Sequence, residues 1–215
     1  MKGLITRDIE ENDLPVLKTF IEDAWGDGWN FNRFDKHTDL FQALLEVYLS
    51  MFLNSSTFGK VAILDGCAVG AILCSMNGDA EKFRQLQKDK VLHTLALLSA
   101  SEAERKDIVE HLSVSFQTIG QLIGNRVDSY DGSLEFIAVV KQAQGLKIGK
   151  TLWGEASDYF KSKGAKSIYL IADSQCNTGF YDHNGFARIA TKEAIYNYTT
   201  GLKRFDVYLY GYNFR

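Results

Sequence analysis

The feature that most constrains this chain is a glycine-punctuated loop between an apolar run and a helical pattern. Residues 134–140 are apolar apart from Glu135, which favours a strand, and Gly145 and Gly149 follow before the helical pattern begins. Glycine has no side chain to separate its N–H from a ligand, and the first N–H groups of a helix lack helical partners. The helix dipole adds about half a positive charge at the same place. The stretch therefore predicts an anion-binding site.

The glycine spacing excludes the two commonest phosphate-binding loops. A Walker A loop needs G-x-x-x-x-G-K-[S/T], and Gly145 and Gly149 are one residue too close, although Lys150 and Thr151 follow. A dinucleotide fingerprint needs G-x-G-x-x-G, and no third glycine is in place. What remains is a relaxed Q-x-x-G-x-[G/A] pattern, opened by a glutamine of the loop.

A second motif follows further along the chain, as N-x-x-F-Y-x-x-x-G-F from Asn177 to Phe186. The two motifs together resemble the signatures of the GNAT N-acetyltransferase superfamily, whose pyrophosphate loop reads [R/Q]-x-x-G-x-[G/A]. The loop fits in two registers, opened by Gln142 or by Gln144. Lys147 replaces a small residue of the family pattern in both registers. The order of expected elements over residues 134–189 is also similar to that family.

The resemblance implies an α/β (α+β) fold with a mixed, mostly antiparallel central sheet flanked by helices. We expect one GNAT-like domain over residues 1–215, with a helical insertion at about 77–125 between the third and fourth strands. The patterns predict strands at 3–7, 60–64, 68–76, 133–140, 167–172, 187–193 and 206–212. They predict helices at 10–24, from Thr38 or Asp39 to 53, at 80–90, 91–99 and 101–124, and at 149–163.

Local signals mark several boundaries of these elements. Asn12 or Asp13 is expected to cap the first helix, and Asp65-Gly66 predicts a hairpin turn. Ser101 and Glu104 have the spacing of a capping box. A loop is expected around residues 196–201.

The resemblance implies acetyl-CoA (CoA) as the cofactor. The glycine loop would bind the pyrophosphate, the preceding strand would offer main-chain N–H groups to the thioester and pantetheine, and the second motif would lie beside the sulfur. The implied cofactor-binding residues are Ile137, Ala138, Val139, Gln144, Gly145, Leu146, Lys147, Ile148, Gly149, Lys150, Asn177 and Phe180.

Two side chains are the candidate catalytic groups. Tyr181 matches the family's tyrosine, and a phenol with a pKa near 10 suits a proton donor to a departing thiolate. Glu135 is the one acidic residue of its strand, and a partly buried carboxylate suits a general base. Alternation predicts Glu135 on the face of Ile137 and Val139, opposite Leu134 and Phe136. A core tyrosine and a strand-surface carboxylate are the structural alternatives.

The acceptor site is expected to be aromatic and acidic. By resemblance it comes from the first helix-loop-helix and the loop between the last two strands, with the substrate residues Trp25, Asp27, Trp29, Phe31 and Tyr196. Aromatic rings with carboxylates suit a cationic amine. The alternative is that these rings fill the core.

Composition excludes several other classes of function. A net charge of −3 gives no support for nucleic-acid binding, and no apolar run reaches the length of a membrane span. His37, His93 and His111 are too scattered for a metal site, His183 is expected to face solvent, and the three cysteines suggest neither zinc nor disulfides. Cys176 is expected to be a packing residue, and a cytoplasmic location is expected.

The sequence leaves three hypotheses for function. The first is an acetyl-CoA-dependent N-acetyltransferase that moves an acetyl group to a primary amine of a small molecule or protein by direct attack in a ternary complex. The alternatives are a non-catalytic acyl-CoA-binding or sensor module of the same fold and an unrelated nucleotide-binding protein. The apolar residues of the insertion must cover something, which leaves a lid, a homodimer surface or filler as its role.

Overall fold

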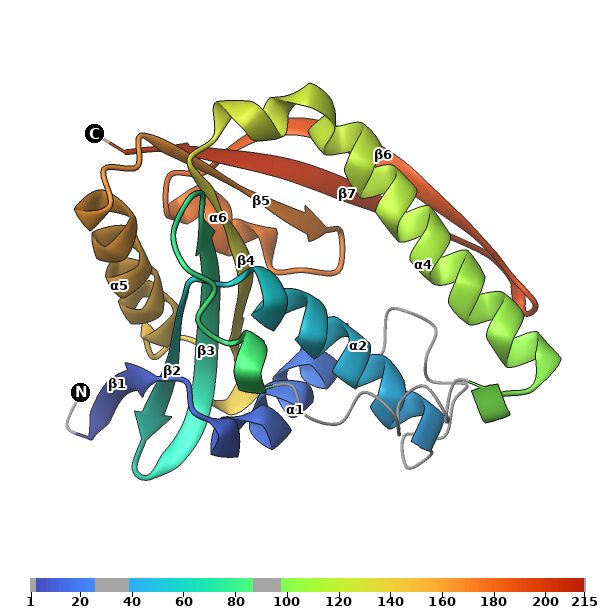
Figure 1. The fold of residues 1–215 in the computed structure, drawn as a ribbon, viewed down its shortest axis with the longest axis horizontal. Coiled ribbons are helices and arrows are strands. Elements are labelled where there is room, and N and C mark those ends of the chain that lie inside the picture. The colour runs from blue at the N-terminus through green and yellow to red at the C-terminus, as the bar shows by residue number, and fades with distance from the viewer. Residues whose placement is uncertain (1–2, 26–38, 87–97, 215) are drawn as a thin grey trace.

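In the computed structural model, residues 3–25, 39–86 and 98–214 are described, and seven strands form one sheet in the order β1-β2-β3-β4-β5-β7-β6 (Figure 1). Only the β4–β5 pair is parallel. The strands are β1 (Leu4–Asp8), β2 (Phe58–Leu64), β3 (Cys67–Met76), β4 (Gly132–Val139), β5 (Ser167–Asp173), β6 (Ala187–Tyr198) and β7 (Gly201–Asn213). The α-helices are α1 (Leu14–Trp25), α2 (Asp39–Ser55), α4 (Glu102–Ile123), α5 (Ile148–Ser162) and α6 (Thr178–His183). The predicted mixed, mostly antiparallel sheet flanked by helices is confirmed.

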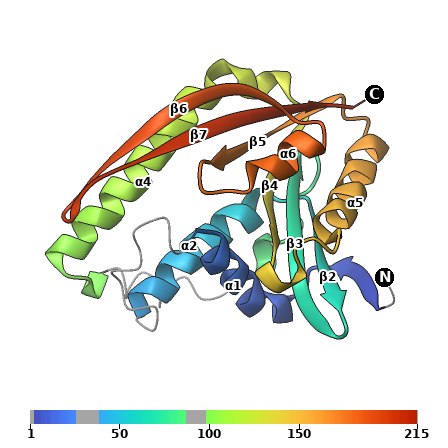
Figure 2. The same cartoon turned by 180° about the vertical axis from the view of Figure 1, so that it is seen from behind.

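The helices cover both faces of the sheet. On one face, α1 and α2 bury their apolar residues against β2, β3 and β4, and α4 covers β5, β7 and β6 (Figure 1). On the other face, α5 and α6 pack over the middle of the sheet (Figure 2). Burial of these apolar stripes is the main stabilising force of such a layered fold.

The parallel β4–β5 pair separates after two residue pairs. Gly132 pairs with Ile168 and Ser133 pairs with Tyr169, and no further pair follows along the two strands. Val140 donates its N–H to the Val69 carbonyl on the β3 side at 3.0 Å. Alternation along a strand then directs the N–H groups of Val139 and Ile137 to the open edge. The splayed strands thus leave an edge of unused main-chain groups inside the sheet.

A bulge in β4 changes which way Glu135 faces. Leu73 pairs with Phe136 and Cys74 pairs with Leu134, so Glu135 is the extra residue of the bulge. Leu134 packs with Ile137 on the α5 face, while Phe136 packs on the α1–α2 face. The predicted alternation, with Leu134 and Phe136 on one face, was therefore wrong. A bulge inserts one residue into the ladder, so a strict period of two cannot hold across it.

Two helix predictions are corrected by the structure. Residues 80–83 are irregular, and only Arg84–Leu86 forms a short 3₁₀ helix in place of the start of the predicted helix at 80–90. The first helix opens with a 3₁₀ turn, Glu11–Asp13, whose capping box joins Glu10 and Asp13. Asp13 therefore closes the box from the third position, and Asn12 is no cap. The predicted helix at 91–99 lies mostly outside the described residues, although residues 98 and 99 are helical.

The last two strands are longer than predicted. Tyr196 and Tyr198 lie within β6, and only residues 199 and 200 make the turn to β7, so the predicted loop at 196–201 was wrong. The outer part of this hairpin is stable because α4 covers it. Tyr196 and Tyr198 are buried in one cluster with Leu122 of α4. Their alternation with exposed residues indicates a strand with one covered face.

Polar contacts hold the insertion helix α4 on the β6–β7 hairpin. It begins at the predicted capping box of Ser101 and Glu104. Asp107 accepts hydrogen bonds from the Thr199 N–H at 2.7 Å and from the Thr199 hydroxyl at 2.9 Å. The His111 ring lies 2.6 Å by Nδ1 from the Tyr198 hydroxyl. The insertion therefore covers a hairpin of its own chain.

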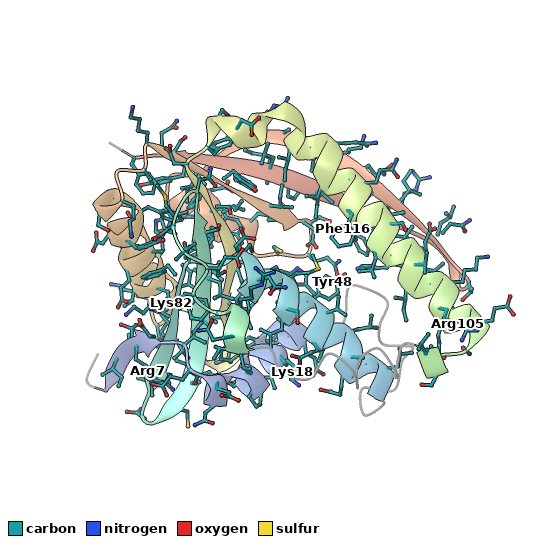
Figure 3. All side chains as sticks on the ribbon, in the orientation of Figure 1. Arg7, Lys18, Tyr48, Lys82, Arg105 and Phe116 are labelled. Carbon is teal, nitrogen blue, oxygen red and sulfur yellow. The ribbon has the colours of Figure 1, made fainter. Side chains whose placement is uncertain are left out.

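The same histidine connects α4 to α2. The His111 ring lies edge to face with Tyr48 at 6.2 Å between centroids, and Tyr48 projects from α2 towards α4 (Figure 3). His111 is 2% exposed, and burial lowers its pKa to about 4. The imidazole is therefore neutral in the folded protein at neutral pH.

Stability should fall between pH 6.5 and pH 4 because of His111. Its folded-state pKa lies below the unfolded value, so between these two pKa values the unfolded chain binds a proton at His111 and the folded chain does not. The contribution is fully present above pH 6.5 and decreases as pH falls towards 4, by up to about 3 kcal/mol. Urea unfolding of His111→Gln should show a flatter pH profile than the parent. The exposed His183→Gln should keep the parent's profile, and an unchanged slope in His111→Gln would contradict the assignment.

Within the described ranges, none of the helices has the length and apolar content that a membrane crossing requires. In the same ranges, no three His, Cys, Asp or Glu side chains gather in a group suited to a metal ion.

Candidate active site

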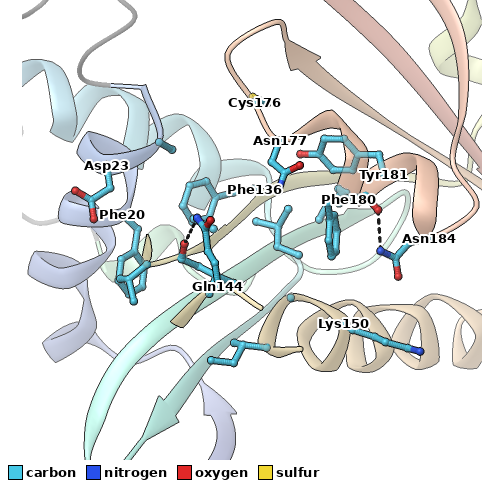
Figure 4. Close-up of a pocket in the computed structure, with 18 of the residues that line it drawn as sticks. Phe20, Asp23, Phe136, Gln144, Lys150, Cys176, Asn177, Phe180, Tyr181 and Asn184 are labelled. Atoms are coloured by element: carbon cyan, nitrogen blue, oxygen red, sulfur yellow. Dashed lines mark hydrogen bonds between the residues drawn. The ribbon is translucent and has the colours of Figure 1, made fainter. Parts of the chain in front are cut away.

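A cavity of about 810 Å³ lies in the cleft between β4 and β5. It is bounded by the end of α1, the loop before α5, and α6, as Figure 4 shows for the labelled residues. Its volume is in the range of small-molecule and cofactor sites, roughly 300–1,000 Å³. Eleven of the twelve predicted cofactor-binding residues line it: Ile137, Ala138, Val139, Gln144, Gly145, Lys147, Ile148, Gly149, Lys150, Asn177 and Phe180. Leu146 does not line the cavity, and its side chain is exposed.

The glycine loop turns through two left-handed residues. Gly145 has φ +81°, and a Cβ added there would meet nothing within 4 Å. Glycine is thus needed for its backbone angle and not for space. Lys147 has φ +57° and ψ +13° and is the N-cap of α5. A non-glycine residue in this region costs roughly 1–2 kcal/mol.

This loop presents several main-chain N–H groups and positive charges. Thr151 is the first residue of α5 whose N–H bonds back along the helix, to the Lys147 carbonyl at 3.0 Å. The N–H groups of residues 148–150 therefore have no helical partner, and they lie at the positive end of a 15-residue helix. Lys141, Lys147 and Lys150 line the same part of the cavity. The site fits a polyphosphate such as the pyrophosphate of CoA.

Gly149 has a packing role. It lies inside the first turn of α5, and a Cβ there would come within 3.0 Å of the Phe180 ring. Gly149 therefore lets α6 approach α5. The left-handed pair Gly145 and Lys147 forms the turn itself, which matches the register opened by Gln142. Of the two glutamines, however, Gln144 lines the cavity and donates to the Val139 carbonyl at 3.3 Å (Figure 4).

Helix α6 brings Asn177 and Tyr181 to the cavity from the side of β5 (Figure 4). Asn177 stands at the N-cap position, but its side chain makes no capping hydrogen bond, so it can contact a ligand. The Tyr181 ring packs on Phe186 and Tyr210 at 5.9 and 5.4 Å between centroids. Burial raises the pKa of the Tyr181 phenol well above its usual range, so it remains protonated.

Trp25 and Cys176 meet across the mouth of the cleft. The Trp25 indole is within hydrogen-bonding reach of the Cys176 thiol and stacks on Phe52 at 5.9 Å. Burial raises the pKa of the Cys176 thiol to about 12, so a thiolate nucleophile is not available at neutral pH. The contact brings the end of α1 against the loop that follows β5.

Glu135 reaches the cavity from the bulge in β4. Ser133 donates a hydrogen bond to its carboxylate, and the Ser55 hydroxyl of α2 is also within reach. Burial raises the pKa of Glu135, and the two hydroxyls lower it in part. A carboxylate with a raised pKa in a cleft suits proton transfer near neutral pH.

The predicted acceptor residues do not all lie at the cavity. Trp25 lines the cavity, whereas Tyr196 lies under α4, 5% exposed, with its hydroxyl 3.1 Å from Ser115. Asp27, Trp29 and Phe31 lie outside the described residues. His183 is exposed, as predicted, but it also lines the rim of the cavity.

The structure adds residues to the site that the motifs did not indicate. Phe20 and Asp23 of α1, Phe136 of β4 and Gln175 after β5 line the cavity. The helical spacing of apolar residues predicted that Phe20 is buried under α1. It could not predict that Phe20 lines the cavity, because that depends on how α1 packs on β4.

The comparisons with known proteins agree with this geometry. Residues 18–186 match the acetyltransferase (GNAT) family, and the chain belongs to that family. Its acyl donor is acetyl-CoA, which is the cofactor of this chain. No curated protein sequence matches the chain.

Solved structures share the fold at low sequence identity. The ribosomal-protein-S18-alanine N-acetyltransferase from Escherichia coli is 12% identical, with a TM-score of 0.55 over 98% of this chain and 93% of that one. The ribosomal-protein-alanine N-acetyltransferase from Brucella melitensis is 17% identical, with a TM-score of 0.52 over 98% and 99%. An N-acetyltransferase from Staphylococcus aureus is 13% identical, with a TM-score of 0.54 over 99% of both chains.

Lys147→Met should weaken acetyl-CoA binding by about fivefold, because the change removes one charge beside the phosphates and keeps the length of the side chain. The affinity of the variant should also depend less on salt than that of the parent. Calorimetric titration at two ionic strengths measures both effects. Lys161→Met, on the last turn of α5, is the control. Equal salt dependence in parent and variant would show that Lys147 makes no phosphate contact.

Proposed function

We propose that this protein is an acetyl-CoA-dependent N-acetyltransferase that acetylates a primary amine of a small molecule or protein by direct attack in a ternary complex. The observation that carries the proposal is that one cavity joins the anion-binding loop, the Tyr181 phenol and the Glu135 carboxylate. These groups come from separate elements, and only the splayed β4–β5 pair brings them to the same space. We also propose that residues 1–215 act as a single domain.

The acceptor side of the cavity supports an amine that carries positive charge. Trp25, Phe20 and Phe136 give it aromatic walls, and Glu135 and Asp23 give it two carboxylates. Ring faces and carboxylates both attract an ammonium group. An acceptor with a net negative charge would be disfavoured there.

The main chain and the loop residues hold the donor. The N–H groups of Ile137 and Val139 on the open edge of β4 are placed to hydrogen-bond the pantetheine or the acetyl carbonyl, and the loop with α5 holds the phosphates. Bound acetyl-CoA supplies an activated acetyl group whose carbonyl carbon bonds to the amine nitrogen as the C–S bond breaks.

Two side chains move the protons. One carboxylate oxygen of Glu135 accepts a proton from the ammonium form of the acceptor, which leaves a neutral amine, and later releases that proton to solvent. The Tyr181 hydroxyl donates its proton to the departing sulfur and regains one from the amine nitrogen. One proton is released overall, and both side chains return to their starting state.

Thiol release in the presence of acetyl-CoA and a panel of amines tests the proposal. The panel should include diamines, amino sugars and a peptide with a free N-terminus, with carboxylic acids as negative controls. Thermal shift with acetyl-CoA, CoA and ATP runs in parallel. Stabilisation by ATP and by neither CoA species would overturn the proposal. Stabilisation by acetyl-CoA without thiol release across the panel would favour a sensor module instead.

A further inference from the structure

Two hydroxyl groups stand in line behind the Glu135 carboxylate. Ser133 and Tyr169 are the last pair of the β4–β5 ladder before the strands separate, so their side chains lie next to each other on the same face of the sheet. Ser133 is buried, and its hydroxyl donates to the Glu135 carboxylate. The Tyr169 phenol lies beside Ser133 and near the Glu135 carboxylate, whose charge adds to burial in raising the pKa of the phenol.

The number of available protons sets the donor-to-acceptor direction of this series of hydroxyl groups. A serine hydroxyl has one proton and two lone pairs. The Ser133 proton is used on Glu135, so in a hydrogen bond between Ser133 and Tyr169 the Ser133 oxygen would be the acceptor. Ser55 is a weaker donor to Glu135, because its single proton also points to the Met51 carbonyl at 3.3 Å.

Among the described residues, no cation forms an ion pair with the Glu135 carboxylate. The described titratable groups that interact with its charge are Cys74 of β3 and Tyr169 of β5, and α2 contributes the non-titratable Ser55. An unpaired carboxylate in a buried place is costly unless hydrogen bonds satisfy it.

We propose that Ser133 and Tyr169 are positioning residues that act in series, with Tyr169 donating to Ser133 and Ser133 to Glu135, to keep the carboxylate ionised and turned to the cavity. The inference rests on the proposed function for its catalytic meaning. Tyr169 also packs in the cluster covered by α4. The insertion helix therefore holds the Tyr169 ring, where the proposed series begins, in place.

A carbon NMR titration of the Glu135 carboxyl group in the free full-length protein tests this inference without acetyl-CoA or turnover. The signal is assigned by its loss in Glu135→Gln. Ser133→Ala should raise the titration midpoint by about one pH unit, because a hydrogen bond to the charged form is lost. Tyr169→Phe should raise it by less. The double variant should match Ser133→Ala alone, because the two hydroxyls act in series.

A matched control removes the hydroxyl of a tyrosine that does not belong to the Tyr169–Ser133–Glu135 series. The Tyr130 ring lies against Tyr169 at 5.4 Å between centroids, and Tyr130→Phe should leave the midpoint unchanged. A midpoint unchanged in both Ser133→Ala and Tyr169→Phe, or additive shifts in the double variant, would overturn the inference. Since the titration needs no substrate, a failure of the proposed function would appear separately, as an absence of thiol release.

Discussion

Replacing Tyr181 with phenylalanine is expected to lower kcat by about a hundredfold to a thousandfold and to leave the affinity for acetyl-CoA unchanged. The phenol would protonate the departing sulfur, and phenylalanine keeps the ring that packs on Phe186 and Tyr210 but has no proton to give. The Tyr181 hydroxyl makes no hydrogen bond to another described residue, so the change leaves no orphaned partner in the protein. Steady-state kinetics with calorimetric titration of acetyl-CoA separates the two quantities.

Tyr196→Phe is the matched control for that variant. Its hydroxyl contacts Ser115 under α4, away from the cavity, so kcat and the KM for the acceptor should both stay at the parent values. The control also tests the acceptor role that the sequence suggested for Tyr196. Equal turnover in Tyr181→Phe and the parent would remove Tyr181 as the acid.

Replacing Gly145 with valine is expected to weaken acetyl-CoA binding by about a hundredfold. Gly145 has φ +81°, an angle that a β-branched residue strongly disfavours, so the loop would change its path. The N–H groups before α5 would then no longer converge on the phosphates, and each hydrogen bond to a charged group is worth about 1.5–3 kcal/mol. Calorimetric titration of acetyl-CoA measures the loss.

A second glycine in the same region shows whether any substitution has this effect. Gly154 lies in the middle of α5 without a positive φ, and a Cβ there meets nothing within 4 Å. Gly154→Ala should keep the affinity and raise the free energy of unfolding by roughly 0.5–1 kcal/mol. Similar affinity losses in both variants would show that the loop angle at Gly145 is not what the phosphates need.

The motifs singled out residues that the structure brings to one cavity, and their role in cofactor binding stays a prediction. Gly145, Lys147, Asn177 and Phe180 all line the cavity, because a strand, a tight turn and a helix start place their residues by local geometry. The acceptor side was predicted less well. Trp25 lines the cavity, but Tyr196 is covered by α4, and no local pattern in β6 distinguishes a ring that faces a ligand from one that faces a helix.

The sequence by itself determined the features that depend on neighbouring residues. These are the Asp65-Gly66 hairpin turn, the capping box of α4 and the glycine loop before α5, since each is built from residues within a few positions of one another. Only the tertiary structure decided which way Glu135 faces and what stands behind it. The bulge arises where β4 is paired with β3, and Tyr169 reaches Ser133 through the β4–β5 register. Register between distant strands is set by the packing of the whole sheet, and no short stretch of sequence contains it.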